Sequence, residues 1–381
     1  ECALSVMPRK VTEHAASMAL TLCAITAAGS GGCASQMNPR QPVMTRTHFV
    51  SNDDRISVTV FDGFGAMATS EPLQSPLERV FFGPQASSKR ALRTPQGLTT
   101  DGKNLWVCDQ GYPDLFQIDP QNGHIRSVTA RTHRPASPIA VAQDEAGNLY
   151  VADATRRSVL AYGPDGLLIY ELTVNGSEHP FEPTALLVRG QHLFIADRAN
   201  RCIARYALAS KSWLASFTPP DPSGLAVPTG LAMTPNGVLL ITDAVMGLIH
   251  RVDHDGTWMI PIGRRGRGPG EMVRPIGVCC TPSGLIVVAD AAKQAIVIFD
   301  EQGTHLNDLS GGENEWRGWT LPMGVACLTE KPDVAGVEAE VDTTHSDWIV
   351  VSDMLGKSGL TLIGVTTEQA RTAISRTEGD R

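Results

Sequence analysis

The feature that most constrains this chain is a short motif that returns six times at nearly equal spacing. Each copy begins with proline, one variable residue, glycine or alanine, and then leucine or valine. The prolines lie 43, 45, 45, 47 and 47 residues apart, at Pro95, Pro138, Pro183, Pro228, Pro275 and Pro322. A period of this length indicates a repeat architecture, in which each copy is one supersecondary unit that packs on its neighbours.

A second motif follows inside each copy. It is an apolar run that ends in a small residue and an aspartate, at Asp109, Asp153, Asp197, Asp243, Asp290 and Asp353. Consecutive apolar residues are typical of a strand that is covered on both faces. An aspartate at the end of such a strand can accept hydrogen bonds from backbone N–H groups of the next loop. We therefore expect all six closing aspartates to be structural.

Each copy then continues with another strand-like run, a glycine-bearing turn and a fourth strand. This order predicts an all-β, six-bladed β-propeller with four-stranded antiparallel blades over residues 54–366, followed by a flexible tail at 367–381. Glycine or alanine near the axis is expected because six inner strands converge on a narrow channel. The composition agrees, since glycine (36) and proline (25) are abundant and aromatic residues are only 6%.

A closed ring needs a strand from one end of the chain to complete the blade begun at the other, because an open sheet edge invites aggregation. We expect an N-terminal strand to close the last blade. Residues 79–83 are the first candidate, because Gly83 precedes Pro95 by 12 residues, the spacing that also separates a glycine from the proline of the fifth copy. Residues 55–61, which alternate apolar and polar side chains, are the alternative.

The chain resembles NHL-repeat proteins over about residues 78–365, in segments such as Pro138-Ile-Ala-Val-Ala-Gln-Asp-Glu-Ala-Gly-Asn-Leu-Tyr-Val-Ala-Asp153 and Gly263-Arg-Arg-Gly-Arg-Gly-Pro-Gly-Glu-Met-Val-Arg-Pro275. The resemblance is to exported bacterial six-bladed NHL lipoproteins. It implies a fold and a binding role rather than a reaction. One departure from the pattern is a long acidic insert at residues 330–347 of the sixth copy.

The first 33 residues are typical of an export signal. A basic start precedes an apolar, alanine-rich stretch, and small residues stand directly before Cys33. This order resembles a bacterial lipobox, so we expect a lipidated Cys33, a polar tether over residues 34–53 and a membrane-anchored position in the periplasm or at the cell surface. The alternative is a plain secretory signal that is cleaved near Ala28 or Ala34.

The inner strands offer the channel mostly hydroxyl, thiol and apolar side chains, namely Gln96, Thr99, Ile139, Thr184, Thr229, Cys279, Cys280, Met323 and Cys327. Metal chemistry in a channel would need several histidine or carboxylate ligands from these strands. The odd number of cysteines after Cys33 and the absence of Cys-x-x-Cys signal neither a disulfide framework nor a zinc site. We assign no catalytic, metal or cofactor residue, and keep a channel-centred lyase or hydrolase as the alternative function.

Charge is divided unevenly between the two faces expected of the ring. Loops that lead into the first strand and out of the second share one face and are rich in Arg and Lys, whereas the hairpin turns of the other face are rich in Asp and Glu. Tight turns favour aspartate for conformational reasons, which accounts for much of the acidic face. On the basic face, blades two and three carry a cluster of arginines: Arg131, Arg134, Arg156, Arg157, Arg198 and Arg201.

Guanidinium groups in such a cluster can clamp carboxylates or phosphates. The alternative is that these arginines are structural or simply solvated. We expect a scaffold whose basic face binds an anionic partner, such as an acidic envelope protein, a lipid headgroup or an envelope polymer. A net charge of −8 and the expected export disfavour nucleic acid as that partner.

Overall fold

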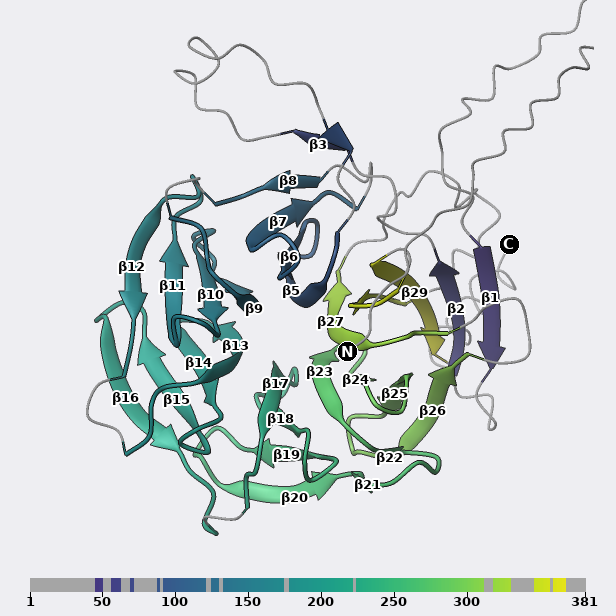
Figure 1. Ribbon diagram of the computed structural model, residues 1–381. Helices are drawn as coiled ribbons and strands as arrows, with labels where there is room; N and C mark the ends of the chain where they lie inside the picture. Colours follow the sequence, from purple (N-terminus) through teal and green to yellow (C-terminus); the bar gives the residue numbers. More distant parts are fainter. Residues whose placement is uncertain are drawn as a thin grey trace, which may run out of the picture. The chain divides into compact units, whose positions relative to one another are not determined.

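Six blades surround a central axis in the part of the chain that the structure describes (Figure 1). The computed structural model describes residues 45–50, 56–62, 69–71, 88–89, 92–120, 125–129, 133–174, 178–221, 224–311, 318–329, 346–356 and 359–367. These residues belong to one compact unit, Gln41–Arg381. Strands are the regular elements throughout these ranges, which confirms the predicted all-β six-bladed propeller.

Blades one to five each consist of four strands in chain order from the axis outward. Blade one holds β5 (Pro95–Thr100), β6 (Leu105–Asp109), β7 (Asp114–Ile118) and β8 (Ile125–Ser127). Blade two holds β9 (Pro138–Gln143), β10 (Leu149–Asp153), β11 (Ser158–Tyr162) and β12 (Leu168–Leu172). Blade three holds β13 (Pro183–Arg189), β14 (His192–Asp197), β15 (Cys202–Ala207) and β16 (Ser212–Phe217). Blade four holds β17 (Pro228–Met233), β18 (Leu239–Asp243), β19 (Leu248–Val252) and β20 (Trp258–Ile262).

Blade five holds β23 (Pro275–Cys280), β24 (Ile286–Asp290), β25 (Ala295–Phe299) and β26 (His305–Ser310). Blade six begins with β27 (Pro322–Leu328), β28 (Asp347–Asp353) and β29 (Leu360–Thr367). The first strand of each blade contacts the first strands of both neighbouring blades, so the inner strands form a closed ring.

Blade six is completed by β2 (Ile56–Asp62), which pairs antiparallel with β29. In Figure 1 the purple β2 lies beside the yellow β29. Closure by an N-terminal strand is therefore confirmed, but the preference for residues 79–83 was wrong. The closing strand is the alternative at residues 55–61, and residues 79–83 lie outside the described part of the chain.

The physical reason for this choice is the alternation of apolar side chains along β2. Ile56, Val58 and Val60 are at most 2% exposed and join the hydrophobic core that blades five and six share. Spacing from the next proline favoured residues 79–83 but carried no information about which side chains could fill that core. Burial of a matching apolar face decides strand register.

Short strands extend the outer edges of two blades. β1 (Thr45–Val50) pairs with β2 and falls inside the segment 34–53 that we expected to be a tether. On blade one, β3 (Thr69–Glu71) pairs parallel with β8, and β4 (Ser88–Lys89) pairs antiparallel with β3. A parallel pair, β21 (Arg264–Arg265) and β22 (Glu271–Met272), lies in the loop between blades four and five. The acidic insert separates β27 from β28, and its residues 330–345 lie outside the described ranges.

Close packing of the blades at the axis explains the glycine of the repeat motif. A Cβ atom added to Gly97 would lie 2.5 Å from the carbonyl oxygen of Ile139 in blade two. A Cβ atom added to Gly277 would lie 2.5 Å from the carbonyl oxygen of Met323 in blade six. Both distances are shorter than real Cβ atoms tolerate, so a side chain at either position would push neighbouring blades apart.

The closing aspartates are buried and hold backbone N–H groups, as predicted. Asp290 accepts hydrogen bonds from Val273 N (2.6 Å) and Arg274 N (2.9 Å) in the loop that leads into blade five. It also accepts from Ala292 N (3.1 Å) and Lys293 N (2.9 Å) in the loop that leaves β24. One carboxylate thus joins two loops and shapes the face of the ring on which both lie.

Asp243 makes the same bonds in blade four and has a further partner. Its Oδ2 lies 3.5 Å from Nε2 of the buried His250 on β19. Burial raises the pKa of Asp243, but the nearby His250 imidazole and the hydrogen bonds from backbone N–H groups outweigh that effect and lower the pKa to about 2. The carboxylate is therefore ionised at neutral pH and serves the fold.

Candidate functional site

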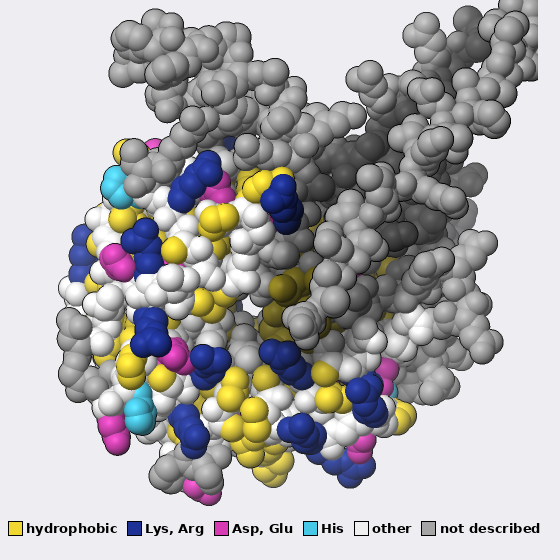
Figure 2. All heavy atoms as spheres, in the orientation of Figure 1, with side chains coloured by type: hydrophobic (Ala, Val, Ile, Leu, Met, Phe, Trp, Pro, Cys, Tyr) yellow, Lys and Arg dark blue, Asp and Glu magenta, His cyan; other side chains and the backbone are white. Residues whose placement is uncertain are grey.

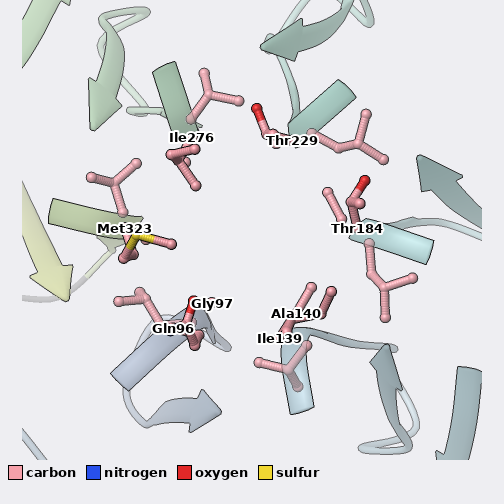
Figure 3. Close-up of a pocket in the computed structure, with 18 of the residues that line it drawn as sticks. Gln96, Gly97, Ile139, Ala140, Thr184, Thr229, Ile276 and Met323 are labelled. Carbon is pink, nitrogen blue, oxygen red and sulfur yellow. The ribbon is translucent and has the colours of Figure 1, made fainter. Parts of the chain in front are cut away.

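The central pocket is lined by the residue that follows the proline in each blade. Figure 3 shows these side chains converging on the axis from the inner strands, and they are Gln96, Ile139, Thr184, Thr229, Ile276 and Met323. The pocket has a volume of about 260 Å³. All six blades therefore contribute one side chain each to a single ring around the axis.

A second ring of lining residues lies two positions further along each inner strand. All six are leucine or valine, namely Leu98, Val141, Leu186, Leu231, Val278 and Val325. Arg274 lies directly before Pro275, at the beginning of the inner strand of blade five and on the other side of the first ring from this aliphatic ring. It lines the pocket and is exposed to solvent. A strand advances about 3.3 Å per residue, so successive positions of the inner strands lie at successive depths along the axis. The pocket is therefore charged at its mouth and aliphatic in its interior.

The hydroxyl groups of the first ring are engaged between blades. Thr184 Oγ1 donates to the Pro228 carbonyl at 2.7 Å, and Thr229 Oγ1 donates to the Pro275 carbonyl at 2.9 Å. Among the described residues that line the pocket there is no carboxylate, imidazole or thiol. The lining therefore offers neither an acid–base pair nor a set of metal ligands, and it suits the binding of apolar groups.

Four residues predicted for the channel, Thr99, Cys279, Cys280 and Cys327, do not line this pocket. Cys279 packs instead in the hydrophobic core between blades five and six. Successive side chains point to opposite faces of a strand, so a residue on an inner strand can face a neighbouring blade rather than the axis. Burial raises the pKa of the Cys280 and Cys327 thiols to about 12, which keeps both protonated at neutral pH.

Two of the predicted arginines are held by buried aspartates. Arg134 Nη2 lies 3.2 Å from Asp114, and Arg156 Nε lies 3.5 Å from the closing aspartate Asp153. Their guanidinium groups are partly occupied within the fold, which matches the structural alternative. Arg131 lies outside the described residues.

The other three predicted arginines lie on blades two and three of the same face. Arg198 Nη2 is 2.8 Å from Glu182, and Arg157 Nη2 is 4.0 Å from the same carboxylate. Both side chains are half exposed, so these ion pairs are weak and open to competition. Arg201 is exposed and borders a surface hollow of about 790 Å³ that also contains His179 and Asn200.

Arg157 and Arg201 share an unusual backbone conformation. Each is the fourth residue after its closing aspartate, with φ of 54° and 50° respectively. The equivalent residues are Gly247 in blade four, with φ of 66°, and Gln294 in blade five, with φ of 59°. This left-handed region favours glycine, because other L-residues bring Cβ too close to the following carbonyl oxygen.

A second basic group, which the sequence analysis did not single out, lies on the loop between blades four and five. Its members are Arg264, Arg265, Arg267 and Arg274. Lys293 fixes this loop, because its Nζ donates to the carbonyls of Gly268 and Glu271 (both 2.8 Å) and to Asp308 (2.7 Å). The sequence signal was the glycine- and arginine-rich run itself, which was interpreted as a repeat motif and as part of the basic face but not as a separate cluster.

Figure 2 looks onto one face of the ring, where Lys and Arg side chains surround the central hollow and Asp and Glu are sparse.

On the hairpin turns, acidic residues mainly stabilise the turn, as when Asp144 accepts a hydrogen bond from Asn148 N at 2.8 Å. Among the described residues, the group that could share a cation is Asp253, His254 and Asp255, on the hairpin turn of blade four and outside the pocket; Asp253 is half-buried and the other two are exposed.

The segments that the structure describes hold no helix with the length and apolarity that a bilayer crossing requires.

No protein-family model matches the chain, and no curated protein matches it. Solved structures do resemble it. A catalytically inactive virginiamycin B lyase from Staphylococcus aureus, crystallised with quinupristin, is 13% identical with a TM-score of 0.51, and the match covers 85% of this chain and 95% of that one.

Two further structures give the same result. A gluconolactonase from Xanthomonas campestris is 13% identical with a TM-score of 0.51, covering 86% of this chain and 96% of that one. A protein of unknown function from Bacteroides thetaiotaomicron is 12% identical with a TM-score of 0.53, covering 74% of this chain and 71% of that one. Identities this low carry the fold and not the activity. The chain thus shares with these proteins the architecture of a six-bladed β-propeller.

Proposed function

We propose that this chain is an exported, lipid-anchored propeller of the NHL type that acts as an interaction scaffold. Its partner is an anionic component of the cell envelope, which docks on the face formed by the loops that lead into strand one and out of strand two. The observation that carries the proposal is the presence of arginine at two left-handed turn positions, Arg157 and Arg201.

A non-glycine residue in the left-handed region costs roughly 1–2 kcal/mol. Gly247 avoids that cost at the equivalent position of blade four. Arg157 and Arg201 therefore occupy neighbouring blades against the preference of the backbone, and the backbone offers no reason for arginine there. The turn imposes this conformation in four blades, including at Gln294, so the conformation alone does not select arginine. We therefore ascribe the choice of arginine in two neighbouring blades to what the guanidinium groups bind.

The surroundings of these arginines favour an anionic partner. Glu182 is shared by Arg157 and Arg198, so a carboxylate or phosphate from outside can replace it without leaving a buried charge. The hollow beside Arg201 offers space for a side chain or headgroup of the partner. Further bases around the central hollow extend the same field, as Figure 2 illustrates.

Replacing both Arg157 and Arg201 with glycine should reduce cross-linking of the protein to its envelope partner about tenfold or more, because two charge-assisted contacts are lost. Stability should not fall, because relief of the left-handed conformation at two positions offsets the greater chain entropy of glycine. Quantitative cross-linking in cells, followed by mass spectrometry, measures the effect.

Gln294→Gly is the matched control, since it changes the same backbone position on blade five without removing a charge. An identical set of cross-links in the double variant and in wild type would contradict the proposal.

Cys33→Ser tests the anchoring part of the proposal. Without the thiol no lipid can be attached, so the variant should lose labelling by a radioactive fatty acid and move from the membrane to the soluble fraction. Fractionation at low and high salt separates a lipid anchor from ionic attachment. No fatty-acid label on the wild-type protein, together with its recovery in the soluble fraction, would support the plain secretory signal instead.

The alternative function is a lyase or hydrolase centred on the channel. It gains some support from the fold that the chain shares with a virginiamycin B lyase and a gluconolactonase. It would require acid–base or metal-binding groups beyond the described lining of the pocket. A stoichiometric, tightly bound metal in the purified protein would favour this alternative over the scaffold.

A further inference from the structure

We propose that the central pocket binds an amphiphilic organic anion, with its acid group at Arg274 and its aliphatic body inside the ring of blades. This inference does not rest on the proposed scaffold function, because it uses a different set of residues. It follows from the order in which charge, polarity and aliphatic surface succeed one another along the axis.

Among the described residues that line the pocket, the charged side chain is that of Arg274, at the mouth. The residues that directly precede the six inner prolines are Thr94, Ser137, Glu182, Val227, Arg274 and Leu321. Arg274 is the base of this set, and the acid, Glu182, is engaged by Arg198 at 2.8 Å. The backbone of Arg274 is fixed at both ends, because its N–H donates to Asp290 (2.9 Å) and its carbonyl accepts from Ala291 N (3.1 Å).

The interior of the pocket cannot accommodate a charge. Below the mouth, the hydroxyl protons of Thr184 and Thr229 are donated to carbonyls of the next blade, and Gln96 Nε2 lies 3.0 Å from the sulfur of Met354. The second ring is aliphatic from all six blades. Burying an ionised group there without partners would be costly, so the acid of the ligand must stay at the mouth.

The size of the pocket narrows the class of ligand further. Sites for drug-sized molecules measure roughly 300–1,000 Å³, whereas this pocket measures about 260 Å³. A single unbranched chain of medium length fits that space better than a fused ring system. An amine of the same length is disfavoured, because the described lining contains the Arg274 guanidinium and no carboxylate.

Isothermal titration calorimetry with the full-length protein tests the proposal. The probes are octanoate, octyl phosphate, octylammonium and acetate. We expect octanoate or octyl phosphate to bind with one-to-one stoichiometry, and the tighter of the two identifies the head group. Acetate lacks the aliphatic body and octylammonium carries the wrong charge, so both should bind at least about tenfold more weakly.

Two substitutions separate the roles of the mouth and the interior. Arg274→Gln should weaken binding of the octyl anions about tenfold or more, whereas Arg267→Gln, which removes a base from the same loop but outside the pocket, should leave it unchanged. Ile139→Trp should abolish binding by filling the ring. Met323→Phe repeats that test from another blade, and thermal unfolding verifies that each variant is folded.

Octylammonium binding as tightly as octanoate would overturn the proposal. Octanoate affinity that is unchanged in Arg274→Gln, or in a folded variant whose ring is filled, would also overturn it. None of these results bears on the cross-linking test of Arg157 and Arg201, so the pocket and the docking face can fail or succeed separately.

Discussion

A Val58→Asp variant is expected to be about 3–5 kcal/mol less stable than wild type. Val58 is 0% exposed in β2 and belongs to the core that blades five and six share. An aspartate there would place an unpaired charge among aliphatic side chains and would break the pairing of β2 with β29 that closes the ring. Urea unfolding followed by circular dichroism measures the loss.

Ile169→Asp is the matched control for this experiment. Ile169 lies on β12, the outer strand of blade two, and is 51% exposed. The same change of residue type should therefore alter stability by no more than about 0.5 kcal/mol. If both aspartate variants unfolded at the same urea concentration, β2 would not be the strand that closes the propeller.

Asp290→Ala should lower the free energy of unfolding by about 3 kcal/mol. The carboxylate of Asp290 is fully buried and accepts hydrogen bonds from four backbone N–H groups in two loops. Alanine leaves those donors without an acceptor in a place that water reaches poorly. Thermal and urea unfolding should both report the loss, and hydrogen exchange should rise in the two loops.

Two further variants test whether the loss of stability in Asp290→Ala comes from the hydrogen bonds of the carboxylate. Asp290→Asn keeps one acceptor oxygen and should recover part of the lost stability. Asp165→Ala removes an exposed aspartate that accepts a hydrogen bond from Leu167 N at 3.0 Å, and should cost less than about 1 kcal/mol. Equal losses in Asp290→Ala and Asp165→Ala would refute a structural role for the closing aspartates.

Most of the architecture could be predicted from the sequence because each repeat contains residues that mark where its strands begin and end. Proline marks the start of every inner strand, glycine or alanine marks the close approach of blades, and the aspartate ends the second strand. These are local requirements of backbone geometry, so they leave a local record in the residues. The six copies reinforce one another, and the number of blades follows directly.

The closing strand was harder to predict because it pairs across almost the whole length of the chain. β2 and β29 meet only in the folded ring, and two N-terminal segments had suitable patterns. Which of them fits depends on the shape of the core between blades five and six, where Ile56, Val58 and Val60 are buried. A repeat period contains no information about that core.

The candidate site divides in the same way. The pocket residues Gln96, Ile139, Thr184, Thr229 and Met323 were predicted, because the motif itself places them beside the axis. The cysteines were wrongly added, since the twist of each strand decides which later residues still face the channel. The partners of the arginines, and the backbone conformation of Arg157 and Arg201, could not be predicted from composition or spacing.

By itself, the sequence determined the class, the number of blades, the inner strands and the structural role of the aspartates, because each depends on contacts within a repeat or between adjacent repeats. Only the tertiary structure decided which strand closes the ring, which arginines are paired with carboxylates and where Arg274 lies relative to the aliphatic pocket. Those properties depend on side chains from distant repeats meeting in space, and desolvation and pairing there are set by geometry that no single repeat encodes.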